Sequence, residues 1–215
     1  MSAAAITLHQ WEPGADPHDN LEVIRAVVRQ AQAGGSSLAV FPEYSSAMTA
    51  GGLTSATPSV TRDGPWMSAL RELSAETGVT VILGALVVSE GESLPRNTMM
   101  AFAGGEVVAR AEKLHLYDAF GAQESALVSP GDIGPVELYE WAGLTVGMMA
   151  CYDLRFPEVA RRLVDAGATA VVVPAQWMAG PNKSSHWETL LRARAVENQV
   201  WVIGINQPGP HAVGK

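Results

Sequence analysis

The sequence of 215 residues contains a single cysteine, Cys151, and relatively few basic residues. One cysteine cannot form an internal disulfide, which fits a protein kept in a reducing cytoplasm. Lysine and arginine number 14 against 22 aspartate and glutamate residues, giving a net charge of −8. Because an acidic surface repels phosphate backbones, we expect no nucleic-acid partner.

Long apolar runs and metal-binding motifs are also missing. The longest apolar stretches, such as LTVGMMACY at 144–152, are far shorter than the roughly 20 residues that cross a bilayer. The N-terminus MSAAAITLHQWEPG lacks a basic region followed by a long apolar segment, so we expect no signal peptide and no membrane partner. Neither HExxH nor paired cysteines occur, so we expect no metal and no cofactor.

What is present suits one globular domain spanning residues 1–215, because 47% of the residues are hydrophobic and only 17% are charged. Apolar runs alternate with amphipathic segments, which predicts an α/β protein with helices covering a mixed sheet. We expect loops at 48–64 and 114–132. The predicted helices are 16–35, 65–78, 156–167 and 184–199. The predicted strands are 4–11, 36–43, 79–90, 97–113 with a turn at Gly104-Gly105, 136–153 with a turn at Ala142-Gly143, 168–175 and 200–207.

Cys151 stands at the end of the apolar strand LTVGMMA, a few residues before the helix FPEVARRL. Ligands bind at the carboxyl ends of strands in α/β sheets, and a helix N-terminus stabilises a thiolate. By itself the position fits a nucleophile and a buried structural cysteine equally well. A nucleophilic cysteine needs a base, and among the histidines His115 and His186 remain candidates.

Two further charged residues follow apolar strands. Glu43 comes just after SSLAVF, and Lys113 comes just after the strand that ends in ARAE. Alone, the glutamate would more often belong to a turn and the lysine to the solvated surface. In a parallel arrangement, however, the ends of these strands and of the strand before Cys151 converge on one rim.

Three segments together resemble the signature segments of the nitrilase (carbon–nitrogen hydrolase) superfamily, and they occur in the same order. They are FPEY at 41–44, EKLHLYD at 112–118 and CYDLRFPE at 151–158; RARAVENQVWVIGIN at 192–206 extends the likeness. The resemblance implies a catalytic set of Glu43, Lys113 and Cys151. It also matches Glu124 to a second glutamate that similar enzymes hold close to the lysine.

The resemblance implies a four-layer α-β-β-α sandwich and a homodimer or larger assembly that packs helices together. Similar proteins continue with a further pair of strands and a tail, whereas this chain ends at HAVGK directly after a loop. We therefore expect a fold that lacks these C-terminal strands.

The chemistry implied is hydrolysis of a non-peptide C–N bond through a thioester on Cys151, with release of ammonia. Glu43 would act as the base, and Lys113 with the backbone N–H of Tyr152 would hold the oxyanion. Tyr117, Arg155 and Trp177 are candidates for the substrate pocket. For Asp153, a local salt bridge that shapes the turn is as plausible as a substrate contact.

CYDLRFPE, with HWETLLRARAVENQ at 186–199, most resembles the branch that hydrolyses small ω-amides, including 2-oxoglutaramate-type acids and deaminated glutathione. A basic side chain such as Arg155 or Lys183 would bind the remote carboxylate of such a substrate. An N-carbamoyl amino-acid hydrolase or a nitrilase on the same triad is the main alternative. A catalytically inactive, truncated relative is another.

Overall fold

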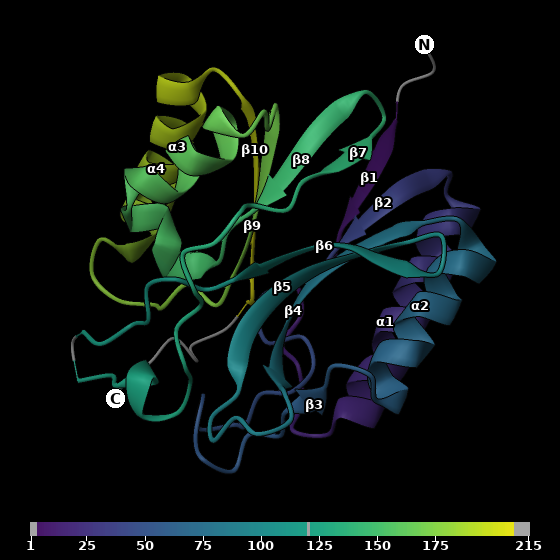
Figure 1. The fold of residues 1–215 in the computed structure, drawn as a ribbon, viewed down its shortest axis with the longest axis horizontal. Coiled ribbons are helices and arrows are strands. Elements are labelled where there is room, and N and C mark those ends of the chain that lie inside the picture. The colour runs from purple at the N-terminus through teal and green to yellow at the C-terminus, as the bar shows by residue number, and fades with distance from the viewer. Residues whose placement is uncertain (1–3, 120, 209–215) are drawn as a thin grey trace.

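A computed structural model describes residues 4–119 and 121–208 of the chain. Two β-sheets lie face to face, and two helices cover the outer side of each sheet (Figure 1). The layers are therefore helix, sheet, sheet and helix, as the resemblance implies. The order of elements alone suggested helices covering one mixed sheet, because it does not reveal where one sheet ends and the next begins.

The first sheet comes from the N-terminal half of the chain. Its strands are β1 (Ala5–Leu8), β2 (Ser36–Val40), β3 (Val60–Thr61), β4 (Thr80–Val88), β5 (Arg96–Ala103) and β6 (Glu106–Glu112). Their order is β1-β2-β4-β5-β6, with β3 paired to β4. β1, β2 and β4 are parallel, and two antiparallel steps from β4 to β5 and from β5 to β6 return β6 to the direction of β2.

The short strand β3 lies inside the segment 48–64, which the sequence predicts to be loop throughout. That prediction is wrong at these two residues: Val60 pairs with Val87 and Thr61 with Val88 at the end of β4. A strand of two residues is too short to show the period-two alternation by which strands are recognised.

The second sheet comes from the C-terminal half. Its strands are β7 (Tyr139–Trp141), β8 (Leu144–Met148), β9 (Ala170–Ala175) and β10 (Trp201–Asn206), in the order β10-β9-β8-β7. β8, β9 and β10 are parallel, and β7 and β8 form the predicted hairpin with its turn at Ala142 and Gly143.

The helices begin and end close to the predicted residues. They are α1 (Pro17–Ala33), α2 (Pro65–Thr77), α3 (Pro157–Asp165) and α4 (Lys183–Asn198), with two 3₁₀ turns, η1 (Glu124–Ala126) and η2 (Cys151–Arg155). The Asp16 carboxylate caps α1 by accepting from the His18 backbone N–H at 2.8 Å. Gly78 ends α2 with a φ of 66°, which glycine adopts without strain. Among the helices of the described ranges, none is long and apolar enough to cross a membrane.

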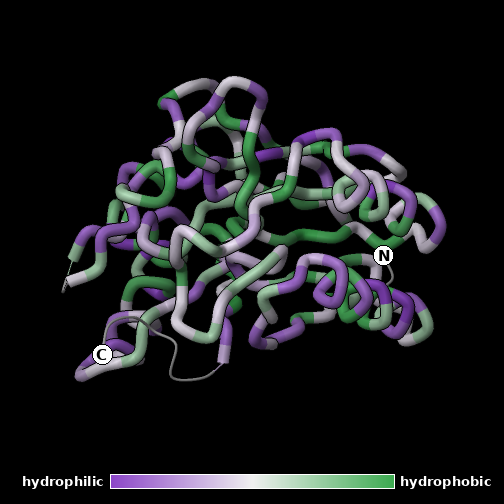
Figure 2. Tube along the Cα trace, turned by 90° about the horizontal axis from the view of Figure 1, so that it is seen from below, coloured by the Kyte–Doolittle hydropathy of each residue, from purple (hydrophilic) through white to green (hydrophobic). Residues whose placement is uncertain are grey.

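Three apolar cores separate the four layers, and the alternation of side chains along the central strands explains them. In β4, Val81 and Leu83 pack towards α1 and α2, while Ile82 packs between the sheets. In β9, Val171 packs towards α3 and α4, while Val172 packs between the sheets. A strand buried on both faces needs apolar residues at every position, which is why these strands read as unbroken apolar runs. Figure 2 shows these hydrophobic segments inside the molecule, with more hydrophilic helices and loops outside.

Candidate active site

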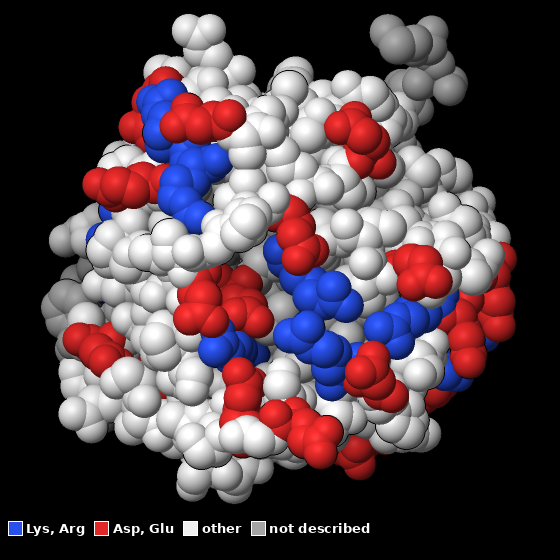
Figure 3. All heavy atoms as spheres, in the orientation of Figure 1, with Lys and Arg blue, Asp and Glu red and all other residues white. Residues whose placement is uncertain are grey.

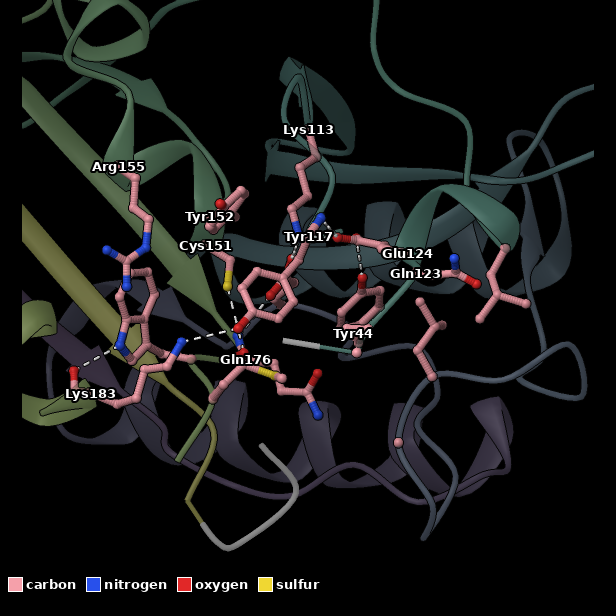
Figure 4. A pocket seen from close by; sticks show the side chains of 18 of the residues that line it. Tyr44, Lys113, Tyr117, Gln123, Glu124, Cys151, Tyr152, Arg155, Gln176 and Lys183 are labelled. Carbon is pink, nitrogen blue, oxygen red and sulfur yellow. Dashed lines mark hydrogen bonds and ion pairs between the residues drawn. The ribbon is translucent and has the colours of Figure 1, made fainter. Parts of the chain in front are cut away.

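A cavity of about 270 Å³ opens where β2 and β6 of the first sheet and β8 and β9 of the second sheet end (Figure 4). The residues that the resemblance implies for catalysis, for the oxyanion and for the substrate pocket line this cavity, whereas the alternatives His115, Asp153 and His186 do not. The lining residues are Glu43, Lys113, Tyr117, Glu124, Cys151, Tyr152, Arg155 and Trp177. The predicted convergence of strand ends is therefore found in the structure, but it joins two sheets and not one.

Glu43 is fully buried and is held on both carboxylate oxygens. Its Oε1 accepts from Asn97 Nδ2 at 2.7 Å and from Lys113 Nζ at 3.0 Å. Its Oε2 accepts from the Gln176 backbone N–H at 2.7 Å. These contacts fix the carboxylate within the cavity and tie it to both sheets.

Lys113 lies between two carboxylates. Its Nζ donates to Glu43 Oε1 at 3.0 Å and to both oxygens of Glu124 at 2.9 Å. Burial by itself lowers the pKa of this lysine, but the neighbouring negative charges, chiefly Glu43, outweigh burial and hold the pKa well above its ordinary value. Lys113 is therefore a permanent cation at neutral pH.

Glu124 begins η1 and is satisfied by four donated hydrogen bonds. Besides the two from Lys113, Tyr44 Oη donates to Oε1 at 2.6 Å and the Tyr117 backbone N–H donates to Oε2 at 2.6 Å. Burial raises the pKa of Glu124, but the Lys113 charge and these hydrogen bonds prevail and lower it. Glu124 is therefore ionised, and the resemblance that placed it beside the lysine agrees with this geometry.

Cys151 begins η2 in the left-handed region, with a φ of 41°. Such a conformation is costly for a residue other than glycine, and it recurs where a side chain must be presented to a site. Its Sγ lies 3.5 Å from the Gln176 carbonyl oxygen, to which the thiol donates.

Burial raises the pKa of the Cys151 thiol well above its ordinary value, and Glu43 raises it further, while Lys113 opposes the shift. The thiol is therefore protonated at neutral pH. The sequence places Cys151 near a helix N-terminus, which would stabilise a thiolate. In the structure Cys151 begins η2, ahead of α3, and burial shifts the pKa of the thiol in the opposite direction.

The histidines that the sequence left open as bases make other contacts. His115 Nδ1 lies 2.8 Å from Asp153 Oδ1, and its ring stacks on Phe156 with 3.6 Å between centroids. His186 Nδ1 lies 3.3 Å from an Arg155 guanidinium nitrogen. Among the carboxylates of the described residues, Glu43 does most to raise the pKa of the Cys151 thiol, and it lines the same cavity.

The outer part of the cavity carries the partly exposed cations Arg155 and Lys183. The Arg155 guanidinium lies 5.0 Å from the centre of the Trp177 ring and 6.0 Å from that of Tyr152, a cation–π arrangement. Lys183 Nζ donates to Tyr117 Oη at 3.0 Å. Tyr117 in turn packs edge-on against Tyr152 (Figure 4).

Asp153 is buried and does not line this cavity, so of the two expected roles the structure favours the local one. Its carboxylate accepts from the backbone N–H groups of His115 at 2.9 Å and of Leu114 and Ala150 at 3.4 Å. It thereby joins the segment after Lys113 to the turn that carries Cys151. Arg194 of α4 braces the same turn by donating to the Leu154 carbonyl at 2.8 and 3.1 Å.

Sequence reasoning missed several groups that support the site, namely Tyr44, Asn97, Gln176 and Gln207. Gln207 Nε2 donates to the Glu43 carbonyl at 2.7 Å, across 164 positions of sequence. One signal was present: Gly84 interrupts the apolar strand β4, and an added Cβ there would lie 2.9 Å from Glu43 Cα. A glycine inside a strand often marks such a close backbone approach.

Among residues 4–119 and 121–208, no group of three or more His, Cys, Asp or Glu side chains is arranged to hold a metal ion.

A family model for carbon-nitrogen hydrolase matches residues 2–214. A Mycobacterium tuberculosis protein named as a hydrolase is 36% identical over 208 residues, which cover 95% of this chain and 72% of the relative. The deaminated glutathione amidase of Escherichia coli O157:H7 is 38% identical over 201 residues, which cover 91% of this chain and 74% of the relative.

Solved structures give the same picture. The NitN amidase from Nesterenkonia sp. AN1 superposes with a TM-score of 0.84 at 28% identity, covering 97% of this chain and 80% of the other. A mutant of that amidase, with a TM-score of 0.82 at 28% identity over 97% of this chain and 78% of its own, shows covalent addition of the acetamide moiety of fluoroacetamide at its active-site cysteine. These matches confirm the predicted superfamily resemblance and fold.

Proposed function

This chain belongs to the carbon–nitrogen hydrolase family and is an amidase, and we propose that it hydrolyses small carboxylate-bearing amides through a thioester on Cys151. One observation carries this proposal. The cavity holds a thiol, a carboxylate and a buried ammonium at its inner end, and two partly exposed cations at its outer end.

The first step is proton transfer from the Cys151 thiol to Glu43 as the sulfur attacks the amide carbonyl carbon. The raised pKa of the thiol supports this coupling, because little free thiolate exists before substrate arrives. The transfer changes no net charge in the buried cluster. Negative charge leaves Glu43 and develops on the carbonyl oxygen of the substrate.

The Lys113 ammonium and the Tyr152 backbone N–H hold that oxyanion. Two other nearby backbone N–H groups could serve as donors to the oxyanion, but both already have acceptors. The Gln176 N–H donates to Glu43 Oε2, and the Trp177 N–H donates to Asn206 Oδ1 at 2.6 Å. Because Lys113 lies between two carboxylates, it remains charged throughout and serves as a donor, not as a base.

Collapse of the tetrahedral intermediate releases ammonia. Glu43 returns the proton to the leaving nitrogen, and the acyl group remains on Cys151 as a thioester. Glu43 then takes a proton from water, which attacks the thioester and releases a carboxylic acid while the sulfur regains its proton. Glu124 orients Lys113 and the amide of the substrate.

Substrate choice follows from the outer cations. Arg155 and Lys183 attract an anionic group at the far end of the substrate, and Trp177 and Tyr117 supply flat walls between that group and Cys151. The amidase relatives named for deaminated glutathione support this class of substrate. We therefore propose ω-amides of dicarboxylic acids as substrates.

The test is ammonia release from a short ω-amide acid and from its uncharged methyl ester. Wild type is compared with Cys151→Ala and Arg155→Met, and Arg192→Met is the matched control. Arg192 lies in α4 with its side chain 80% exposed, 3.6 Å from Glu188. We expect Cys151→Ala to be inactive. The ratio of kcat/KM for the acid to kcat/KM for the ester should fall about fivefold in Arg155→Met and stay at the wild-type value in Arg192→Met.

Equal kcat/KM for acid and ester in wild type would refute the proposed recognition of a substrate carboxylate. It would leave the proposed amidase activity unaffected. Carbon dioxide released with ammonia from N-carbamoyl amino acids would indicate the carbamoyl hydrolase, and turnover of nitriles would indicate a nitrilase. No turnover of any of these by folded protein would indicate an inactive relative.

We further propose a cytoplasmic homodimer whose only partners are its small-molecule substrates. The single free cysteine, Cys151, fits a reducing compartment. On the face drawn in Figure 3, basic side chains are interspersed with acidic ones and form no continuous basic surface. Arg96, for example, contacts Glu92, Glu112 and Asp132.

A further inference from the structure

Tyr44, the residue after Glu43, has an unusual backbone. Its φ is 57°, in the left-handed region, and its side chain is buried. Residues other than glycine rarely adopt this conformation, and where they do the surroundings hold them there. Such an outlier next to a proposed catalytic residue calls for a function.

The backbone conformation brings two consecutive side chains to one place. Along an extended strand, neighbouring side chains point to opposite faces. Here Glu43 and Tyr44 both line the cavity, and Figure 4 shows the Tyr44 hydroxyl directed at Glu124. The hydroxyl donates to Glu124 Oε1 at 2.6 Å, the length of a strong bond to a charged acceptor.

The segment 43–44 thus reaches the Lys113 ammonium by two routes. Glu43 contacts Nζ directly at 3.0 Å. Tyr44 holds Glu124, whose two oxygens each accept from Nζ at 2.9 Å. The remaining hydrogen bond to Glu124 comes from the Tyr117 backbone, so Tyr44 is the side chain besides Lys113 that orients this carboxylate in the described structure.

We propose that Tyr44 is a positioning residue that sets the orientation of Glu124 and, through it, of the Lys113 ammonium. The inference rests on the proposed function, because it assumes that Lys113 acts on the oxyanion. Burial and the Glu124 charge both raise the pKa of the Tyr44 phenol, so it stays protonated and donates across the working pH range.

Tyr44→Phe isolates the hydroxyl. The ring packs against Met48, Leu86 and Val128, and phenylalanine preserves these contacts. The matched control is Tyr139→Phe. Tyr139 is also buried, but it lies between the sheets and its hydroxyl has no hydrogen-bond partner in the described residues.

We expect Tyr44→Phe to lower kcat by about tenfold to 100-fold, the value of a hydrogen bond to a charged group, with KM changed by less than about threefold. Tyr139→Phe should leave both constants at the wild-type values. Tyr44→Phe should unfold at a lower temperature than Tyr139→Phe, because it leaves a buried carboxylate one hydrogen bond short, but both variants should be folded at the assay temperature.

The pH profile gives a readout that packing would not move. The charged and titratable groups facing Glu124 are Lys113, Tyr44, Glu43 and Cys151. Because the phenol donor helps to lower the pKa of Glu124, its loss raises that pKa and moves the acid limb of kcat to higher pH. The acid limb of Tyr139→Phe should not move.

Crystal structures of both variants supply a readout that is independent of turnover. Rotation of the Glu124 carboxylate away from its two contacts with Lys113 in Tyr44→Phe supports the inference. An unchanged Glu124–Lys113 pair, or kcat and acid limb equal to wild type, overturns it. Inactive wild type, or active Cys151→Ala, refutes the proposed function separately, and the crystal structures then still decide the role of Tyr44.

Discussion

The inner and outer parts of the cavity use charge in different ways. At the inner end, Glu43, Lys113 and Glu124 are 0%, 2% and 7% exposed, and every charge has a partner within 3.0 Å. At the outer end, Arg155 and Lys183 are partly exposed and lie against aromatic rings.

The difference follows from the dielectric environment. Removing one member of a buried charge cluster leaves the others desolvated and unpaired, at a cost of several kcal/mol. Removing a charge that water already screens costs far less. The inner cluster should therefore decide whether the chain folds and reacts, and the outer cations should decide which substrate it prefers.

Lys113→Met should give the largest effect, because it leaves two buried carboxylates without their cation. We expect a loss of about 3–5 kcal/mol in the free energy of unfolding, measured with urea, and no detectable acyl-enzyme. Arg192→Met, at an exposed ion pair, should change stability by less than about 0.5 kcal/mol. Acyl-enzyme formation by Lys113→Met at the normal rate would refute the oxyanion role.

Asp153→Asn tests the junction between the Lys113 and Cys151 segments. Both oxygens of Asp153 accept from N–H groups, so an amide must turn its NH₂ towards a donor. We expect a loss of about 1.5–3 kcal/mol in stability together with a lower kcat. Asp132→Asn, whose side chain is 88% exposed, is the control. Equal urea midpoints for the two variants would contradict the proposal that Asp153 stabilises the contact between these two segments.

The pH dependence of stability has a predicted sign at each end. The lowered pKa of Glu124 contributes stability above its ordinary value of 4.5, which is lost as pH falls through the folded pKa. The raised pKa of Cys151 contributes stability that is fully present below the ordinary thiol pKa of 9.0. Above that pH this stability is lost, by at most about 1.4 kcal/mol per pH unit. Lys113, also raised, acts in the same direction above 10.5.

The melting temperature should therefore be nearly constant between the ordinary pKa values of Glu124, 4.5, and Cys151, 9.0, and should fall on either side. Cys151→Ser removes the titrating thiol, so its melting temperature should fall less steeply above pH 9, with the acid side unchanged. An alkaline fall as steep as that of wild type would show that the thiol does not titrate as proposed.

Lys183→Met should give the smallest effect. The side chain is partly exposed, so we expect about 0.5–1 kcal/mol, seen as a twofold to fivefold rise in KM for the ω-amide acid. The KM for the methyl ester, kcat and the melting temperature should stay near the wild-type values. A fall in kcat comparable with that of Lys113→Met would erase the distinction between the inner and outer parts.

Local pattern was sufficient for most elements. The ends of α1 and α2 lie within two residues of the predicted ones, and the hairpin turns at Gly104 and Ala142 lie where predicted, because helix capping and turn formation depend on a few adjacent residues. Glu43, Lys113 and Cys151 were proposed from motifs at strand ends, and Glu124 from the family resemblance. By contrast, neither Tyr44 nor Asn97 was singled out, since their roles depend on partners 80 and 54 positions away.

By itself, the sequence determined the alternation of strands and helices, the family resemblance and the residue types available for chemistry. Tertiary structure alone decided that two sheets face each other and that their strand ends meet at one cavity. It also decided the state of each group there. A thiol next to a helix suggested a thiolate, yet burial keeps Cys151 protonated, while Lys113 stays charged between two carboxylates. Protonation depends on desolvation and on charges from distant segments, and neither can be read from neighbours in the chain.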